Sequence, residues 1–351
     1  MTKKKVSLPQ FGNYSIPFEY IITHGLEMDY ITPPPMTRRT LEIGSKYSPD
    51  YVCAPFKLNV GSFIEAIEAG ADTIAQISGD CRLGYYGELQ EQILRDLGYD
   101  VTFVNLANCS EKKPLTYIRE FQKINPELSI KKLVAAFANG MTMVKYMDDI
   151  DAFIRRHIGF EREMGRMEEI YSQWLDELRS CDSKKEMKAL HSITLKRLKR
   201  VELNKPKKLL KVGVVGEYYT IMDSFSNHNL ERELAQMGMY IDRWMDLTNS
   251  LFHYKDKDML PKIKAYCDYS IGATAMATVD AALKYAKQGY DGIIHVKSFG
   301  CTPETDAVPV LQNISADYKI PILYLSYDSQ TSDTGLKTRL EAFYDMIYMR
   351  K

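Results

Sequence analysis

The chain has 351 residues, with 46 Lys or Arg and 46 Asp or Glu, so its formal net charge is +0 at pH 7. Without an excess of positive charge no global field attracts nucleic acid or anionic lipid, so we expect neither partner. Residues 6–13 alternate apolar with polar side chains, unlike a signal peptide, and no apolar run approaches the roughly 20 residues of a membrane helix. We therefore expect a cytoplasmic protein of two or three domains with reduced cysteines.

The first 112 residues alternate short β-type runs with helical patterns. The predicted strands and helices are, in chain order, the strand 51–54, the helix 62–69, the strand 72–78, the helix 86–97 and the strand 101–106. Strands that alternate with amphipathic helices form a parallel sheet with helices on its faces. Residues 1–112 are therefore predicted to form a first α/β domain.

The middle of the chain has a different composition. Residues 113–207 are rich in Lys, Glu, Arg, Met and Leu and contain almost no glycine, and 148–178 shows helical periodicity over several turns. The pattern breaks at the Asn-Lys-Pro-Lys-Lys of 204–208. This stretch is predicted to be a helical insert or connector.

The α/β rhythm resumes in residues 208–351, which we interpret as a second α/β domain. Its elements are predicted as the strands 209–216, 239–245, 292–296 and 321–326 and the helices 229–237, 276–287 and one from about 305. The two halves are alike in architecture, although no residue-level repeat is apparent between them.

Three of the six cysteines lie at Gly/Pro turns. Cys53 is in VCAP (52–55), Cys81 in GDCRLG (79–84) and Cys301 in FGCTPE (299–304). A turn exposes the sulfur and surrounds it with backbone N–H groups, which favours thiolate ligation of a metal cluster. Ligands of open parallel sheets gather beyond the carboxyl ends of the strands, where we expect all three cysteines. The alternative for any one of them is a small buried core residue.

Several phrases in the right order resemble one known family. They are GDCRLGYY (79–86), GYDG (289–292) leading into FGCTPE (299–304), and TRLEAF (338–343). The chain is similar to the 2-hydroxyacyl-CoA dehydratase superfamily over residues 35–110 and 208–348, and more narrowly to its acyl-CoA dehydratase activase-related branch. The resemblance implies two flavodoxin-like domains that hold a 4Fe-4S cluster through Cys53, Cys81 and Cys301.

The resemblance also implies partners and a reaction class. In this superfamily an ATP-dependent activator protein supplies a low-potential electron, and dehydratase-type or reductive chemistry on an acyl-CoA follows. The chain would then be a dehydratase-like lyase or a reductase component, acting on an acyl-CoA or another small molecule, as a homo- or heterodimer. The alternatives are a non-catalytic electron-transfer or scaffold component and a cluster-free small-molecule-binding protein. Some relatives carry a double-cubane cluster, which would need about six ligands.

The residues themselves agree with a cluster. Three thiolates on a 4Fe-4S cube leave one iron without a protein sulfur, so such a site can carry electrons and also bind a substrate. Arg82 and neighbouring glycine N–H groups would stabilise the thiolate charge. Cys109 also follows a predicted strand and is a possible fourth ligand, whereas Cys181 and Cys267 are interpreted as structural.

Other polar residues are interpreted from their place in the predicted elements. Glu217 follows the first strand of the second domain, where a carboxylate can point into a cleft and act as an acid or base, or simply be solvated. Glu304 is expected to be a first-turn helix acid and His295 a packed core histidine. No phosphate-binding glycine loop and no pair of histidines at zinc-ligand spacing occurs in the sequence, so ATP hydrolysis is assigned to a partner protein.

Overall fold

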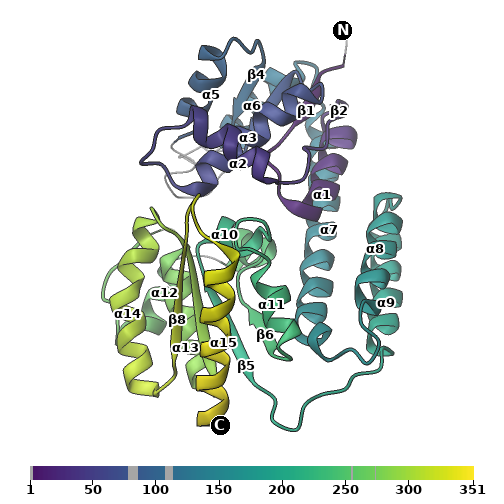
Figure 1. The fold of residues 1–351 in the computed structure, drawn as a ribbon. Helices are drawn as coiled ribbons and strands as arrows, with labels where there is room; N and C mark the ends of the chain where they lie inside the picture. Colours follow the sequence, from purple (N-terminus) through teal and green to yellow (C-terminus); the bar gives the residue numbers. More distant parts are fainter. Residues whose placement is uncertain (1–2, 78–85, 107–113, 254–255, 273) are drawn as a thin grey trace. The chain divides into compact units, whose positions relative to one another are not determined.

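The protein folds into two compact units, Met1–Val144 and Lys145–Lys351 (Figure 1). The computed structural model describes residues 3–77, 86–106, 114–253, 256–272 and 274–351. Each unit contains one four-stranded sheet in which every strand pair is parallel. The prediction of an α/β protein with two parallel sheets is therefore confirmed.

The sheet of the first unit has the strand order β2-β1-β3-β4. Its strands are β1 (Lys5–Ser7), β2 (Asp29–Tyr30), β3 (Thr73–Gln76) and β4 (Thr102–Asn105). Its helices are α1 (Ser15–Tyr20), a π-helix (Ile21–Gly25), α2 (Arg38–Tyr47), α3 (Ala54–Glu68), α5 (Gly87–Asp96) and α6 (Pro114–Ile124). The long helix α7 (Ile130–His157) begins in this unit and ends in the second.

Two helices of the first unit cross at unusually close range because glycines lie at the crossing. A Cβ atom added to Gly44 of α2 would lie 1.7 Å from the Lys57 carbonyl oxygen, and one added to Gly61 of α3 would lie 2.0 Å from the Thr40 carbonyl oxygen. Helix α2 begins with a capping box formed by Thr37 and Thr40. The glycines therefore allow α3, which carries Cys53 at its N-terminal end, to lie directly against α2.

One predicted strand in this unit is wrong. Residues 51–54 form a turn that leads into α3, because Pro55 at the second helical position favours a helix start over an extended run. The strands β1 and β2, of three and two residues, were not predicted because runs that short give too little alternation to detect. The predicted strands 72–78 and 101–106 correspond to β3 and β4, and both predicted helices are present.

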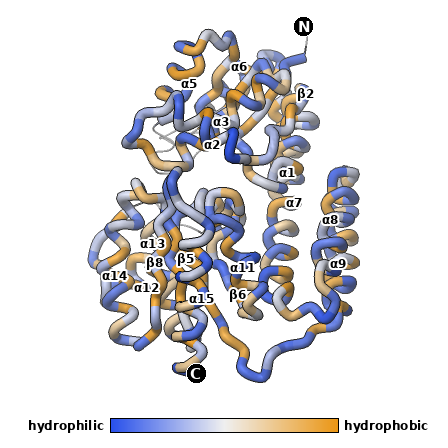
Figure 2. Tube along the Cα trace, in the orientation of Figure 1, coloured by the Kyte–Doolittle hydropathy of each residue, from blue (hydrophilic) through white to orange (hydrophobic). Residues whose placement is uncertain are grey.

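The middle of the chain is helical, as predicted. After α7 come α8 (Arg166–Arg179) and α9 (Lys184–Lys199), and α9 begins with a capping box of Ser183 and Glu186. The apolar face of α8 is buried and includes Trp174, which is fully enclosed. Both helices show a mixture of hydrophilic and hydrophobic residues along their length (Figure 2), which is typical of helices with one buried face. The domain boundaries at 112 and 207 stay predictions.

The sheet of the second unit has the strand order β6-β5-β7-β8. Its strands are β5 (Lys211–Gly216), β6 (Tyr240–Arg243), β7 (Gly292–Ser298) and β8 (Ile322–Tyr327). Its further helices are α10 (Tyr218–Met222), α11 (Leu230–Gln236), a π-helix (Asn249–His253), α12 (Asp256–Ile263), α13 (Ala275–Lys287), α14 (Thr302–Tyr318) and α15 (Asp333–Arg350). The predicted strands correspond to these four, and α14 begins three residues earlier than predicted.

Both sheets have the order 2-1-3-4 when the strands of each are numbered along the chain. This is the flavodoxin-like order without its fifth strand, and its topological switch point lies between the first and third strands of each sheet. In the second unit these are β5 and β7, which are paired from Val212↔Gly292 to Gly216↔Val296. None of the helices in the described parts of the chain is long and apolar enough to cross a membrane.

Candidate functional site at the carboxyl edge of the second sheet

The switch point of the second sheet is flanked by two of the predicted site residues. Glu217 comes directly after β5, and Cys301 comes three residues after the end of β7. Ligands of open parallel sheets bind in the crevice outside the carboxyl ends of the strands at such a point. The strand order thus places a carboxyl and a thiol just beyond the carboxyl ends of the two strands where ligand binding is expected.

Cys301 is the N-cap residue of α14 and is partly exposed. Its sulfur does not cap the helix, while its carbonyl oxygen accepts hydrogen bonds from the N–H of Thr305 (3.1 Å) and the Thr305 hydroxyl (2.9 Å). The ammonium of Lys297 donates to the Phe299 carbonyl oxygen (3.3 Å) and to the Thr305 hydroxyl (3.2 Å). The Cys301 turn therefore combines a helix N-terminus with a nearby cation, a setting that favours an anionic ligand.

A fully buried histidine–carboxylate contact lies one helical turn from Cys301. The side chains of Glu304 and His295 are essentially inaccessible to solvent, and Glu304 Oε2 lies 2.8 Å from His295 Nε2. Glu304 Oε1 accepts hydrogen bonds from the hydroxyls of Thr274 (2.6 Å) and Thr278 (3.1 Å). The sequence correctly predicted a first-turn acid and a core histidine, but not their pairing, because residues nine apart on a strand and the following helix give no periodic signal.

Glu217 is partly buried and is the N-cap residue of α10. Its carboxylate accepts hydrogen bonds from the N–H groups of Tyr219 (2.7 Å) and Thr220 (2.9 Å) and from the Thr220 hydroxyl (2.5 Å). Burial raises the pKa of Glu217 and the Glu304 charge adds to the rise, against the lowering effect of these hydrogen bonds. The structure therefore gives Glu217 a capping role with a raised pKa, and its catalytic role stays a prediction.

A second acidic residue at this sheet edge was missed from the sequence. Asp246 follows β6, and burial together with the nearby Asp148 charge raises its pKa to about 6. Its carboxylate accepts a hydrogen bond from the N–H of Asn249 (2.6 Å), and Asp148 accepts one from the N–H of Thr248 (2.7 Å). The sequence signal for Asp246 was its place just after a predicted strand. The nearby Asp148 gave no such signal, because it lies about 100 residues earlier in the chain, on α7.

Replacing Asp246 by Asn should stabilise the second unit at pH 7 but not at pH 4. The pKa of Asp246 in the folded protein, about 6, lies above its ordinary value of 3.8, so stability falls as pH rises from 3.8 through 6. The gain at pH 7 is expected to be on the order of 1–3 kcal/mol. Urea unfolding at both pH values, with the exposed Asp268→Asn as control, measures it. An equal gain at both pH values would contradict the assignment.

Cys53 is placed on α3 in the same way as Cys301 on α14. Each cysteine is the N-cap residue of its helix with an extended backbone, is partly exposed, and is followed by a proline at the second helical position. Each is also preceded two residues earlier by an exposed aromatic ring, Tyr51 (77% exposed) or Phe299 (70% exposed). The segments YVCAP (51–55) and FGCTP (299–303) therefore share the pattern aromatic-X-Cys-X-Pro, which was not predicted from the sequence as a motif.

The remaining cysteines divide into two groups. Cys81, Arg82 and Cys109 lie outside the described residues. Cys181 and Cys267 are buried and hydrogen-bonded to the carbonyl oxygens of Glu177 and Tyr269, and burial raises the pKa of Cys181. Among the residues that the structure describes, no three His, Cys, Asp or Glu side chains are grouped as a metal site.

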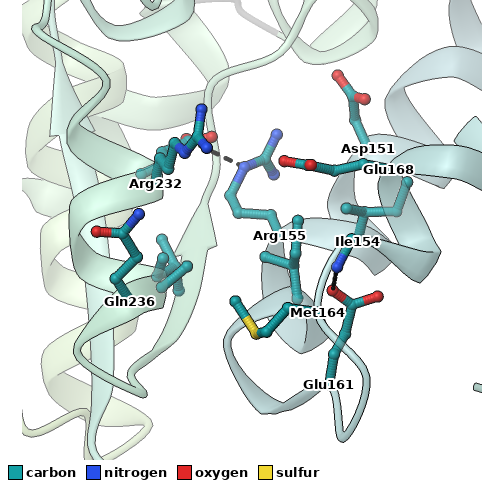
Figure 3. Close-up of a pocket in the computed structure, with 13 residues that line it drawn as sticks. Asp151, Ile154, Arg155, Glu161, Met164, Glu168, Arg232 and Gln236 are labelled. Carbon is teal, nitrogen blue, oxygen red and sulfur yellow. Dashed lines mark hydrogen bonds and ion pairs between the residues drawn. The ribbon is translucent and has the colours of Figure 1, made fainter. Parts of the chain in front are cut away.

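A separate cavity of about 380 Å³ lies between α7, α11 and the turn before α8 (Figure 3). On its wall Arg155 contacts Glu231 (Nε to Oε1, 3.0 Å), which is also 3.0 Å from Arg243. Burial opposes ionisation of Glu231, but the two guanidinium groups outweigh it and lower its pKa. None of the predicted site residues lines this cavity, and its charged wall is accounted for as a buried ion-pair network.

Fold and site together define a class of protein: paired flavodoxin-like units with a thiol at the N-terminal end of a helix in each. The chain belongs to the family of the 2-hydroxyglutaryl-CoA dehydratase D-component, whose family model matches residues 125–347, more than half of the chain. The match includes Glu217 and Cys301 and begins after Cys53 and Cys81. Membership of the 2-hydroxyacyl-CoA dehydratase superfamily, expected from the sequence, is confirmed. No curated protein matches the chain.

Proposed function

We propose that this chain is an iron–sulfur subunit of a dehydratase-type system, with one 4Fe-4S cluster bound through Cys53, Cys81 and Cys301. It accepts low-potential electrons from an ATP-dependent activator protein, in the cytoplasm, for dehydratase or reductive chemistry on an acyl-CoA or another small substrate. The observation that carries this proposal is the placement of Cys301 at the start of α14, beside the switch point of a sheet in a dehydratase-family chain.

The described thiols fit such a cluster in their chemistry. Cys53 and Cys301 are partly exposed, neither sulfur caps its helix, and each lies at the positive end of a helix, which favours a negatively charged group of thiolates and sulfides. A bound 4Fe-4S cluster would supply one-electron transfer and an iron site open to a substrate oxygen. That three sulfurs share one cluster, with Arg82 supporting the thiolates, stays a prediction.

In the proposed reaction the chain's own groups hold and move protons. Glu217 stands beyond β5 with a raised pKa, so its carboxyl holds a proton more readily than a solvated glutamate does. Transfer of that proton to a substrate would require the carboxyl to leave its hydrogen bonds with Tyr219 and Thr220.

The same hydrogen bonds favour a second candidate function. A carboxylate that satisfies two N–H groups at the start of α10 already has a structural role. A non-catalytic electron-transfer or scaffold subunit would need Glu217 only for that role. Dehydration of a 2-hydroxyacyl-CoA by the reduced protein with an activator supports the enzyme. A redox-active protein without turnover, in which Glu217→Gln leaves electron uptake unchanged, supports the carrier.

The cluster itself is tested by metal analysis of anaerobically purified protein. Wild-type protein is expected to contain about four iron and four sulfide per chain, with reduction-sensitive visible absorption. Cys301→Ser, Cys53→Ser and Cys81→Ser should each lose most of the iron and sulfide. The controls Cys181→Ser and Cys267→Ser should keep both. Iron retained in all three ligand variants, or absent from the wild type, would contradict the proposal.

A further inference from the structure

We propose that His295 and Glu304 are a positioning pair for Cys301. Their contact fixes the first turn of α14 and so holds the Cys301 sulfur in one position. The identity of what the sulfur binds rests on the proposed function. The positioning of the sulfur rests on contacts within the second unit alone.

The pair is costly to bury, which is the first reason to assign it a specific role. Both residues are 0% exposed, and α14 packs here against the apolar core that includes Ala307, Val296 and Ile294. Replacing both partners of a buried hydrogen-bonded pair by apolar groups of the same shape can be nearly neutral or even stabilising. Packing alone therefore does not account for a glutamate at this position.

The direction of the Glu304 side chain is the second reason. Glu304 is the third residue after the N-cap Cys301, the position from which a glutamate usually turns back to bond the N-cap N–H in a capping box. Here the Cys301 N–H donates instead to the Ser298 carbonyl oxygen (3.0 Å), and the Glu304 carboxylate points into the interior. Glu304 therefore forms its hydrogen bonds in the protein interior and does not cap the N-terminal end of α14.

The carboxylate joins three elements at the base of the Cys301 turn. One oxygen meets His295 on β7 (2.8 Å), and the other accepts bonds from Thr274 and Thr278 at the start of α13 (2.6 and 3.1 Å). His295 in turn is held edge-on by the ring of Tyr324 on β8, with 5.7 Å between ring centres. The first turn of α14 is thus tied to two neighbours by bonds with a fixed direction, which apolar contacts do not provide.

The other thiol turn shows that a polar clamp is not a general requirement of this motif. Three residues after Cys53, at the position that corresponds to Glu304, is Phe56, which is fully buried and packed edge-on against Tyr86 at 5.2 Å between ring centres. The Cys53 turn is therefore held by apolar packing in the core of its own unit. Cys53 thus serves as an internal reference for any change at Cys301, because the same molecule carries both thiols.

The test measures the reactivity of the two thiols in the purified full chain without metal. Both are alkylated with iodoacetamide in native protein, and the rates are read by mass spectrometry of the Cys53 and Cys301 peptides. In Glu304→Leu the turn loses its directed bonds, so the Cys301 rate is expected to change by about tenfold while the Cys53 rate stays within about twofold of wild type. Glu304→Gln keeps the shape and most bonds and should restore a rate near wild type.

Two further variants keep the proposal testable if Glu304→Leu does not fold. His295→Gln removes the imidazole ring that contacts Glu304 from β7, and it should produce the same selective change in the Cys301 alkylation rate. Asp149→Asn is the control, because it removes a His–carboxylate pair of similar length, His191 to Asp149 at 2.7 Å, on the surface of the same unit. Unchanged Cys301 rates in Glu304→Leu or His295→Gln, or equal changes at both thiols, would overturn the proposal.

A separate experiment measures the iron content of the same variants after anaerobic purification. A selective fall in Glu304→Leu with recovery in Glu304→Gln links the positioning to metal binding. If the wild type holds no iron, the proposed cluster fails while the alkylation result still decides whether the pair positions Cys301. The two failures are therefore distinguishable.

Discussion

Replacing Gly216 by Ala is expected to destabilise the second unit by about 3 kcal/mol or more, because the new Cβ has no room and the backbone disfavours it. Gly216 has φ +145°, and a Cβ built on it would lie 1.8 Å from the Val296 carbonyl oxygen on the neighbouring strand. That same oxygen accepts the N–H of Glu217 at 2.9 Å. The substitution must therefore push β5 away from β7 at the switch point, where Glu217 and Cys301 are carried.

The two tryptophans, Trp174 and Trp244, both belong to the second unit, so urea unfolding followed by their fluorescence reports on it directly. Gly289→Ala is the matched control: it also has a positive φ (+69°), but a Cβ there meets nothing within 4 Å. Its cost should be only about 1 kcal/mol. Equal losses in the two variants would mean that the close approach of β5 to β7 does not limit stability.

The sequence predicted the elements of the second unit well because its inner strands are mostly apolar runs with a glycine at one end. The run 209–216 corresponds to β5 and 292–296 to β7, and both strands are almost entirely buried. Strand order did not follow from these runs. It depends on which strands pair, and the β5–β7 pair joins residues about 80 positions apart.

The candidate site was predictable only where one residue carried its own signal. Cys301 and Glu217 stand at strand-to-helix turns that the sequence marks with glycine and proline. The pairing of His295 with Glu304 and the proximity of Asp148 to Asp246 arise from packing of elements that no periodicity connects. The pattern shared by YVCAP and FGCTP is present in the sequence, but it became informative only once both cysteines proved to be N-cap residues.

Replacing Gly61 by Ala is expected to destabilise the first unit strongly, with a cost of about 2–4 kcal/mol. Its Cβ would lie 2.0 Å from the Thr40 carbonyl oxygen, so α3 would have to move away from α2. Such a movement breaks the contacts of the buried Glu65 carboxylate, which accepts bonds from the Thr40 hydroxyl (2.6 Å) and from Arg39 (2.8 Å).

Because α3 begins at Cys53, the same movement should also change the exposure of that thiol. Hydrogen exchange of the α2 and α3 amides, together with the alkylation rate of Cys53, measures both effects without interference from the tryptophans of the second unit. Gly335→Ala in α15 is the control, since Gly335 is exposed, its Cβ would make only ordinary contact at 3.4 Å, and a helical Ala should stabilise by about 0.5–1 kcal/mol. If Gly61→Ala leaves α2 and α3 as protected as in the wild type, the close crossing does not hold Cys53 in place, and packing of Phe56 alone must do so.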